Sequence, residues 1–330
     1  MRIKELAEKL GVSTYTVSVA LSGKSGVSEA TRKRVVEAAA RFGYQPDNAG
    51  RMLRSGRSCQ VGVVMPPWNN PYIAELCMGI QACLTARNYT PVFAVDNTQN
   101  PVPGNLEKLL SLRIAGLITV ASSLLPDDVD LPVVSYFFDD PRFDSVCPDP
   151  ELDSRQIIAY LKACGHRKIG YLGWLKDLRL KWLISEAERC KLEFPPRWRL
   201  GARHPLTENL FERLLETNRG KDLPTALIIH NDAMALKTIR HIHEAGFRIP
   251  EDFSLIGHDN TSYCASSIPA LTSMSCGPID KIASALVDLL LARIKDPDRP
   301  RGKVLLRSEL VRRESVANLN NMPSKQGGAQ

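Results

Sequence analysis

The sequence predicts a small all-α helix-turn-helix head joined to a larger α/β core of two doubly wound parallel-sheet units. The first 45 residues contain short helical periodicities separated by glycines. From residue 60 onward, continuous apolar runs alternate with helical segments, as in sheets covered on both faces. The charge is divided in the same way. Residues 1–60 carry 11 Lys and Arg against 5 Asp and Glu, so +6 of the net charge of +7 lies in this stretch.

The first helix is predicted over about residues 3–10. Its apolar stripe recurs at helical spacing: Ile3, Leu6, Ala7 and Leu10. Gly11 then ends the helix. A second short helix, beginning near Ser13 or Thr14, completes a helix-turn-helix motif.

The second helix has two faces of different chemistry. Its inward face carries Val17, Ala20 and Leu21. Its outward face is assigned to DNA contact: Thr14, Tyr15, Ser18 and Val19. Hydroxyl groups and an apolar side chain at such positions can meet base edges and a thymine methyl group. The basic charge adds a salt-sensitive attraction to DNA phosphates. The alternative for this segment is a generic three-helix bundle that does not bind DNA.

A third helix follows from Ser28, which is predicted to be its N-cap, through Thr31 to Arg41, and it closes at Gly43. Three of its residues are expected to face inward: Val35, Val36 and Ala39.

Residues 44–60 form a polar, basic linker by composition. A short helix near residues 48–55 is expected to be marginal, because Gly50 costs helix stability. The apolar Leu53 suggests a wedge into a DNA minor groove, and Arg51 and Arg54 are assigned to DNA contact beside it. The alternative is a tether whose Leu53 touches its own core.

The sequence pattern predicts four strands and two helices in the first half of the core. The strands span residues 60–66, 91–96, 116–121 and 132–138, and the helices span about 72–87 and 105–111. The segment 144–153 is taken as a connection.

The second half repeats the pattern. Helices are predicted at 150–164, 177–192, 207–218, 232–245 and 279–295, and strands at 168–174, 225–231, 253–259, 271–276 and near 303–311. The tail at 318–330 lacks apolar periodicity and is expected to be disordered.

Two doubly wound units predict a ligand cleft near their junction, at the carboxyl ends of the strands. Polar residues that end strands or open helices are the candidates for ligand contact: Asn70, Tyr72, Arg179, Asn231, Asp232, Asp259 and Asn260. The Asn and Asp side chains can equally cap helices, and Arg179 can either pair with a polar ligand or be solvated.

Several classes of protein are disfavoured. No phosphate-binding glycine motif, P-loop or G-x-S-x-G elbow occurs, so neither an enzyme nor a cofactor is predicted. The six histidines lack sequence-local partners, and surface or capping roles are expected for them. The eight cysteines have no metal-like spacing, so reduced thiols without a disulfide or structural metal are expected. No apolar run approaches the ~20 residues of a membrane span and no secretory core follows Met1, which predicts a cytoplasmic protein.

The head and linker, IKELAEKLGVSTYTVSVALSGKSGVSEATRKRVVEAAARFGYQPDNAGRMLRSGRS, resemble the lactose-repressor (LacI/GalR) family of bacterial transcription regulators. The core agrees through VGVVMPPWNNPYIAELCMGI, GHRKIGYLG and ALIIHNDAMALKTIRHIHEAGFRIPEDFSLIGHDN. The resemblance implies a homodimer, or a dimer of dimers, that binds a near-palindromic operator. It also implies a periplasmic-binding-protein-like core that holds a small effector, usually a sugar or nucleobase.

The resemblance also implies roles for individual residues. Thr14 and Tyr15 match base-contacting positions, and Leu53 matches the leucine that the family inserts into the minor groove. Val19 stands where the family commonly has Arg, which implies a different operator. Four residues match effector-contacting positions: Tyr72, Arg179, Asn231 and Asp259. Phe137 replaces a frequent aspartate. Trp68, Trp174 and Trp182 suggest stacking on a sugar face, or core or dimer-interface packing.

The predicted organisation is a DNA-binding domain at 1–45, a hinge at 46–59 and a core at 60–317. The core comprises an N-subdomain at 60–148 and 278–306 and a C-subdomain at 149–277 and 307–317. The predicted function is a ligand-responsive repressor of sugar-utilisation genes, whose effector is either an inducer or a corepressor. The alternatives are a solute-binding protein, which would carry a secretory signal, and an α/β enzyme, which would need a glycine motif.

Overall fold

The computed structural model describes residues 1, 3–21, 25–44, 58–66, 70–95, 102–120, 125–126, 129–137, 140–202 and 208–321. The chain divides into two compact units, Met1–Cys59 and Gln60–Gln330. The expected hinge helix, with Arg51, Leu53 and Arg54, lies outside the described residues, as does Trp68.

The head contains the three expected helices: α1 (Ile3–Leu10), α2 (Thr14–Leu21) and α3 (Glu29–Arg41). Their small core consists of Leu6, Ala7, Val17, Ala20, Val35 and Ala39. Ser28 caps α3, because its hydroxyl accepts a hydrogen bond of 3.2 Å from the Thr31 backbone N–H. Gly11 adopts a φ of +63° after α1, a conformation that favours glycine. The helix-turn-helix prediction is confirmed.

Two orientations predicted in the head are wrong. Val19 is only 7% exposed, because the loop after α2 returns over it: a Cβ placed on Gly26 would lie 3.6 Å from its Cγ1 atom. Arg32 of α3 also donates to the Ala20 carbonyl at 2.9 Å, which holds α3 against the end of α2. Val36 is 47% exposed, because α3 is covered on one side only and Val36 follows buried Val35 by one residue.

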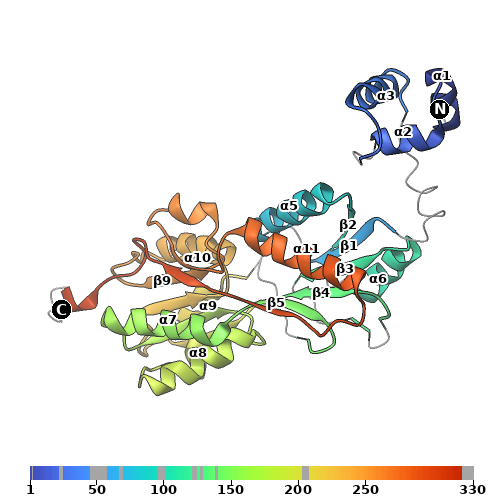
Figure 1. Cartoon of the computed structure of the whole chain (residues 1–330). Helices are drawn as coiled ribbons and strands as arrows, with labels where there is room; N and C mark the ends of the chain where they lie inside the picture. Colours follow the sequence, from blue (N-terminus) through green and yellow to red (C-terminus); the bar gives the residue numbers. More distant parts are fainter. Residues whose placement is uncertain are drawn as a thin grey trace. The chain divides into compact units, whose positions relative to one another are not determined.

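The first half of the core is built on a six-stranded sheet in the order β11-β5-β4-β3-β1-β2, with every neighbouring pair parallel. Its strands are β1 (Gln60–Met65), β2 (Thr90–Val95), β3 (Gly116–Val120), β4 (Val133–Tyr136), β5 (Asp144–Pro148) and β11 (Lys303–Leu306). The helices α5 (Pro71–Ala86) and α11 (Ile279–Lys295) cover one face, and α6 (Val102–Ser111) covers the other (Figure 1).

The second half has a sheet in the order β12-β10-β9-β8-β6-β7. Its strands are β6 (Ile169–Gly173), β7 (Arg199–Gly201), β8 (Ala226–Ile229), β9 (Ser254–His258), β10 (Thr272–Ser275) and β12 (Glu309–Val311). All pairs are parallel except β10 with β12. The helices α7 (Pro150–Ala163) and α8 (Leu178–Arg189) pack on one face, and α9 (Leu210–Thr217) and α10 (Asp232–Glu244) pack on the other.

Hydrophobic packing explains both sheets. Alternate residues of each strand contribute to different clusters: Val63 of β1 packs with α5 and α11, whereas Val64 packs with α6. In the second sheet, Ile228 and Ile229 of β8 divide in the same way. Each sheet is therefore covered on both faces, which confirms the prediction of two doubly wound units.

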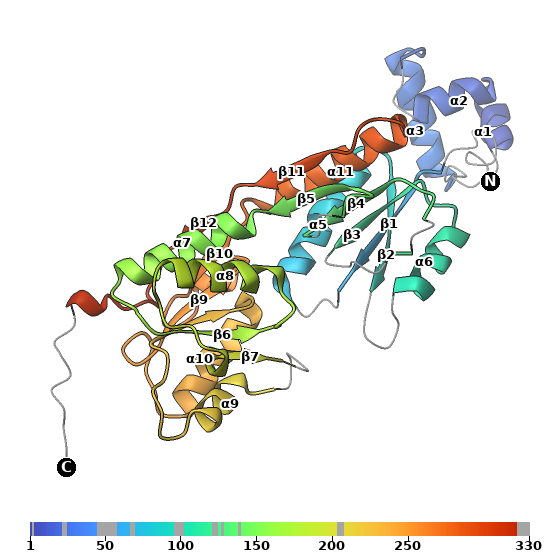
Figure 2. The ribbon, with the colours of Figure 1, turned by 90° about the horizontal axis from the view of Figure 1, so that it is seen from below.

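The chain passes between the two halves three times: from β5 to α7, from β10 to α11, and from β11 to β12 (Figure 2). Both halves are consequently discontinuous in sequence.

Four details of the core differ from expectation. The segment taken as a connection contains β5, and residues 303–311 form two strands rather than one. The short strand β7 and the 3-10 helices at Pro196–Trp198 and Ser262–Ala265 have no counterpart in the predicted elements. The tail begins with a 3-10 helix at Leu319–Asn321, and its Leu319 N–H donates to the Cys164 carbonyl at 2.8 Å.

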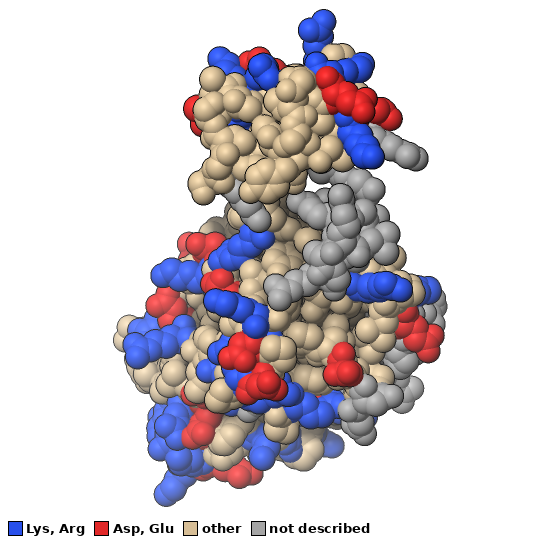
Figure 3. Space-filling model, turned by 45° about the vertical axis from the view of Figure 1, so that its right-hand side comes forward, with Lys and Arg blue, Asp and Glu red and all other residues tan. Residues whose placement is uncertain are grey.

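By sequence the core is nearly neutral, because +6 of the net charge of +7 lies in residues 1–60, and its surface agrees with this balance. Basic and acidic side chains are interspersed over the face of the core seen in Figure 3. Within the described ranges, every helix is too short or too polar to span a bilayer. The eight cysteines are free thiols.

Candidate functional site

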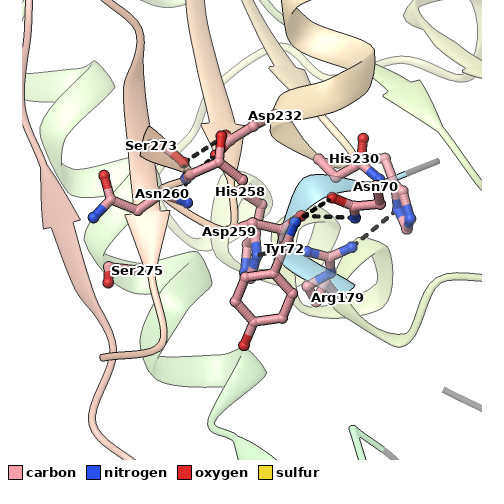
Figure 4. A network of polar contacts seen from close by, with 12 residues as sticks. Asn70, Tyr72, Arg179, His230, Asp232, His258, Asp259, Asn260, Ser273 and Ser275 are labelled. Atoms are coloured by element: carbon pink, nitrogen blue, oxygen red, sulfur yellow. Dashed lines mark hydrogen bonds and ion pairs between the residues drawn. The ribbon is translucent and has the colours of Figure 1, made fainter. Parts of the chain in front are cut away.

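Polar side chains from both halves of the core converge on one network (Figure 4). Asn70 immediately precedes α5. Arg179 lies in the first turn of α8. Asp259 and His230 follow the carboxyl ends of β9 and β8. These are the ends of parallel strands at which α/β proteins hold ligands.

Asn70 and Asp259 connect the two halves directly. The Asn70 side-chain Nδ2 donates a hydrogen bond of 3.1 Å to Oδ2 of Asp259. Its Oδ1 accepts a hydrogen bond of 3.1 Å from the Tyr72 N–H, so the same side chain caps α5. Asp259 adopts a φ of +106°, which non-glycine residues rarely do, and such strained residues concentrate at functional sites.

Arg179 is held by Asp177 in a two-pronged ion pair. Its Nε lies 3.1 and 3.0 Å from the two carboxylate oxygens, and its Nη2 lies 2.6 Å from Oδ2. Asp177 is fixed in turn because its Oδ1 caps α8 by accepting from the Arg179 backbone N–H at 2.9 Å. Burial opposes ionisation of Asp177, yet the adjacent charge of Arg179 and the contact with His230 hold its pKa well below the usual range.

His230 completes this cluster. Its Nδ1 lies 2.8 Å from Asp177 Oδ2 and 2.9 Å from Arg179 Nη2. Burial lowers the pKa of His230, so the ring is neutral at pH 7. Exposed Trp174 contacts the ring edge-on, with centroids 6.4 Å apart.

Tyr72 is buried, and its hydroxyl is engaged inside the protein. The hydroxyl is hydrogen-bonded to that of Tyr136 on β4, and burial raises the pKa of both groups. The ring of Phe137, whose centroid lies 4.1 Å from that of Tyr136, packs beside them. Phe137 has a φ of +73°, so it is, after Asp259, a second non-glycine residue in a strained backbone conformation.

Asn231 is the N-cap of α10, because its side-chain oxygen accepts from the Met234 N–H at 2.9 Å. The capping role that the sequence left open is therefore present. Asp232 is buried and accepts hydrogen bonds from the Ser273 hydroxyl at 2.6 Å and the Thr261 N–H at 2.7 Å. Burial, followed by the nearby charge of Asp259, raises the pKa of Asp232 to about 6.

His258 and Asp153 belong to the same network, although no local sequence pattern points to either. His258 Nε2 lies 3.6 Å from Asp153 Oδ2, and its Nδ1 lies 3.5 Å from Asp259 Oδ1. Both side chains are buried, and the two carboxylates raise the pKa of His258 although burial opposes its charge. The expected surface role is wrong for His166, His230 and His258, whose partners are remote in sequence.

A cavity of about 20 Å³ lies beside this network, which is room for about one water molecule. Its polar lining includes Asp153, Tyr171, Arg179, His230 and His258. Of the four residues matched to effector contacts, Arg179 and Asp259 thus meet in one network, Tyr72 adjoins it, and Asn231 opens the helix next to it.

The exposed face of α2 is a second candidate site. Tyr15 is 72% exposed, and Thr14 and Ser18 are exposed beside it. Ser13 caps the helix by accepting from the Thr16 N–H at 3.0 Å. Three of the four predicted α2 contacts are thus available to a partner, whereas Val19 is not.

The two units match two family models. A model described as "Bacterial regulatory proteins, lacI family" matches residues 2–47, and one described as "Periplasmic binding protein-like domain" matches residues 158–316. Two full-length relatives are named HTH-type transcriptional repressor PurR. The protein from Aliivibrio fischeri strain MJ11 is 32% identical, covering 96% of this chain and 98% of its own. The protein from Haemophilus influenzae strain PittEE is 30% identical, covering 96% and 99%.

Solved structures share the fold. The Lac repressor bound to ONPG in its repressed state has a TM-score of 0.78 at 24% identity, and the CelR–cellobiose complex has a TM-score of 0.68 at 22% identity. Both alignments cover 96% of this chain and 99% of the other.

Proposed function

The chain belongs to the LacI family of bacterial regulatory proteins, and we propose that a small molecule held in its core controls the affinity of its helical head for operator DNA. It is a DNA-binding transcriptional repressor with an effector-binding core and not an enzyme. Its place of action is the cytoplasm, where a bacterial regulator meets the chromosome.

The head contacts the major groove through the exposed side chains of Thr14, Tyr15 and Ser18. Their exposure on α2, with the opposite face packed in the head core, supports this role. Burial of Val19 leaves it a packing residue that supports the recognition helix. In the hinge, Leu53 enters the minor groove between Arg51 and Arg54, as the sequence resemblance implies.

The effector binds beside Arg179 and Asp259, with Tyr72 and Asn231 at the margins of its site. The observation that carries this proposal is the hydrogen bond between Asn70 and Asp259, because it places the polar network at a contact between the two halves of the core. A ligand bound there interacts differently with different arrangements of the two halves, which is the requirement for allosteric control.

The protein acts as a homodimer, and the two halves of each core correspond to residues 60–148 with 278–306 and residues 149–277 with 307–317. Effector binding changes the spacing of the paired hinges, so that both heads and both Leu53 side chains engage one operator together in one state only. A coupling of about 1–3 kcal/mol is typical of such control.

The effector is a sugar in this proposal. Exposed Trp174 at the edge of the network offers a ring face of the kind that stacks on sugars. The CelR structure contains cellobiose, and a LacI-family regulator from Enterococcus faecium contains ribose. A nucleobase is the second candidate class, because the family resemblance implies either a sugar or a nucleobase as the effector.

The test is a fluorescence titration of operator binding, first without ligand and then with sugars and nucleobases. The operator is sought in the promoter upstream of the protein's own gene by gel shift. Leu53→Ala is expected to weaken specific binding, and one compound class is expected to change operator affinity about 5- to 150-fold in either direction. Operator affinity that no compound alters would contradict the effector mechanism, and binding indifferent to Leu53→Ala would contradict the wedge.

A further inference from the structure

The guanidinium of Arg179 is already neutralised by the protein. Asp177 makes three contacts of 3.1 Å or shorter with it, through both carboxylate oxygens. The ion pair is largely buried, with side-chain exposures of 18% and 9%. The Nε–Nη2 edge of Arg179, which binds the Asp177 carboxylate in this way, is closed to a ligand anion.

Asp177 is rigidly placed for this role. Its Oδ1 caps α8, while its Oδ2 also lies 2.8 Å from His230 Nδ1 and accepts a hydrogen bond of 3.2 Å from the Tyr171 hydroxyl. With the Arg179 guanidinium, four groups therefore hold the carboxylate in place. A ligand anion could not displace it without leaving a buried carboxylate unpaired, which is costly.

The charges around this pair also disfavour an anion. Among the described residues, the network adds the carboxylates of Asp153, Asp232 and Asp259 to that of Asp177. The cationic groups of the network are Arg179, His258 and, at its edge, Arg313. The Arg313 guanidinium donates to Asn260 Oδ1 and to the Leu271 carbonyl, each at 2.7 Å. The acidic groups outnumber the available cations, so the site repels negative charge.

The other end of the network shows which chemistry fits. Asp259 Oδ2 accepts a hydrogen bond from the uncharged amide of Asn70. A hydroxyl or N–H group of a neutral ligand can make the same hydrogen bond, whereas a phosphate cannot donate from its ionised oxygens.

We propose that Asp177 is a specificity-determining residue: it occupies the fork of Arg179, excludes phosphate and carboxylate effectors, and reserves the site for uncharged ligands that donate hydrogen bonds to Asp259. The inference rests on the proposed location of the effector site. It adds that a free sugar or base is accepted while its phosphorylated form is rejected.

The test measures binding of inorganic phosphate and of ribose 5-phosphate to the full chain by calorimetry in a phosphate-free buffer. The key variant is Asp177→Asn, which keeps an oxygen to cap α8 but removes the charge. Asp177→Ser is a second variant, because Ser is also a good N-cap. The matched control is Asp222→Asn, which removes the same charge from an exposed ion pair with Lys168. That pair lies next to the first residue of β6, whereas Asp177 lies beyond the last.

The wild type and Asp222→Asn are expected to show no saturable binding of either probe. Asp177→Asn is expected to bind both probes saturably, at least about tenfold more tightly than the upper limit set for the wild type, since one neighbouring charge commonly changes ionic equilibria by one to three powers of ten. The double variant Asp177→Asn/Arg179→Gln is expected to lose that gain.

Saturable binding of either probe to the wild type that Arg179→Gln abolishes would overturn the inference. So would the absence of a gain in both Asp177 variants. These outcomes are independent of the operator titration, so failure of the proposed function and failure of this inference can be distinguished.

Discussion

The side-chain amide of Asn70 donates a hydrogen bond of 3.1 Å to the carboxylate of Asp259, which lies 189 residues later in the chain. This bond joins the two halves of the core at the proposed effector site. Because both partners have isosteric substitutes, the contribution of the bond can be measured without changing the shape of either side chain.

Asn70→Asp is expected to open this contact, because it keeps the cap of α5 and places two carboxylates against each other. Amide hydrogen exchange around residues 70–76 and 257–262 should quicken by roughly five- to fifteenfold, in line with a loss of about 1–1.5 kcal/mol. The double variant Asn70→Asp/Asp259→Asn restores a donor and an acceptor in reversed order. It is expected to recover most of the protection, and a double variant no better protected than Asn70→Asp would show that the bond contributes nothing.

Arg293→Met is expected to lower the free energy of unfolding by about 3–5 kcal/mol, because it leaves Asp144 buried without its partner. Arg293 Nε lies 2.9 Å from Asp144 Oδ2, both side chains are almost fully buried, and Arg293 also donates to the carbonyls of Pro297 and Pro300. The measurement is urea denaturation at pH 7. Arg240→Met is the control, because it breaks an exposed pair with Glu244 and should cost less than about 0.5 kcal/mol. Equal losses would contradict the prediction.

His166 should make the fold sensitive to acid. Burial lowers its pKa to about 4, and its ring nitrogens contact the Thr225 hydroxyl at 2.8 Å and the Ala317 carbonyl at 3.2 Å. The unfolded chain takes up this proton near the ordinary pKa of 6.5. The stability is therefore complete above pH 6.5 and is lost as the pH falls toward 4. His166→Gln removes this dependence, so the stability difference between pH 7 and pH 5 should shrink by about 2 kcal/mol in urea denaturation. An unchanged difference would exclude His166 as its source.

Tyr15→Ala is expected to weaken specific operator binding by roughly 10- to 100-fold, the usual range for one base contact, and to leave the melting temperature unchanged. The stability should not change because Tyr15 is 72% exposed on α2. Gel shifts with specific and scrambled DNA separate the two effects. Tyr263→Ala is the matched control, since it removes another exposed tyrosine from the core, and a loss common to both variants would argue against base contact.

Val19→Ala is expected to destabilise the head by about 1–2 kcal/mol, because the side chain is packed beneath the loop at Gly26. The same substitution at exposed Val36 should be close to neutral. Thermal unfolding followed by circular dichroism compares the two variants. If Val19→Ala instead kept wild-type stability and altered the base preference, the result would contradict the buried orientation and support the outward one predicted from the sequence.

Elements with a single dominant pattern were predictable from sequence. The stripe of α1, the cap at Ser28 and the β-branched runs of β1, β3 and β8 each combine local propensity with burial in the same direction. The strand β5 was not predictable, because Asp144 and Pro148 are poor strand formers and the strand depends on β4, β11 and the distant Arg293.

The candidate site was predictable only where position along a strand or helix sufficed. Arg179 and Asp259 follow from such positions and from the family resemblance. Asp177 caps the helix of its own partner Arg179, but its contact with His230, like that of His258 with Asp153, joins different elements, and no local pattern encodes these two contacts. Val19 and Val36 show the same limit in the head, because tertiary packing, not helical periodicity alone, decides which valine is covered.

The discontinuity of the first sheet also bears on protein synthesis. As the chain leaves the ribosome, the head has all of its core residues within the first 44 positions and can fold at once. The first half of the core cannot, because α11 and β11 come from residues 279–306 and the partner of Asp144 is made 149 residues later. The DNA-binding end of each new chain is therefore expected to be folded before the half of its core that begins next to it.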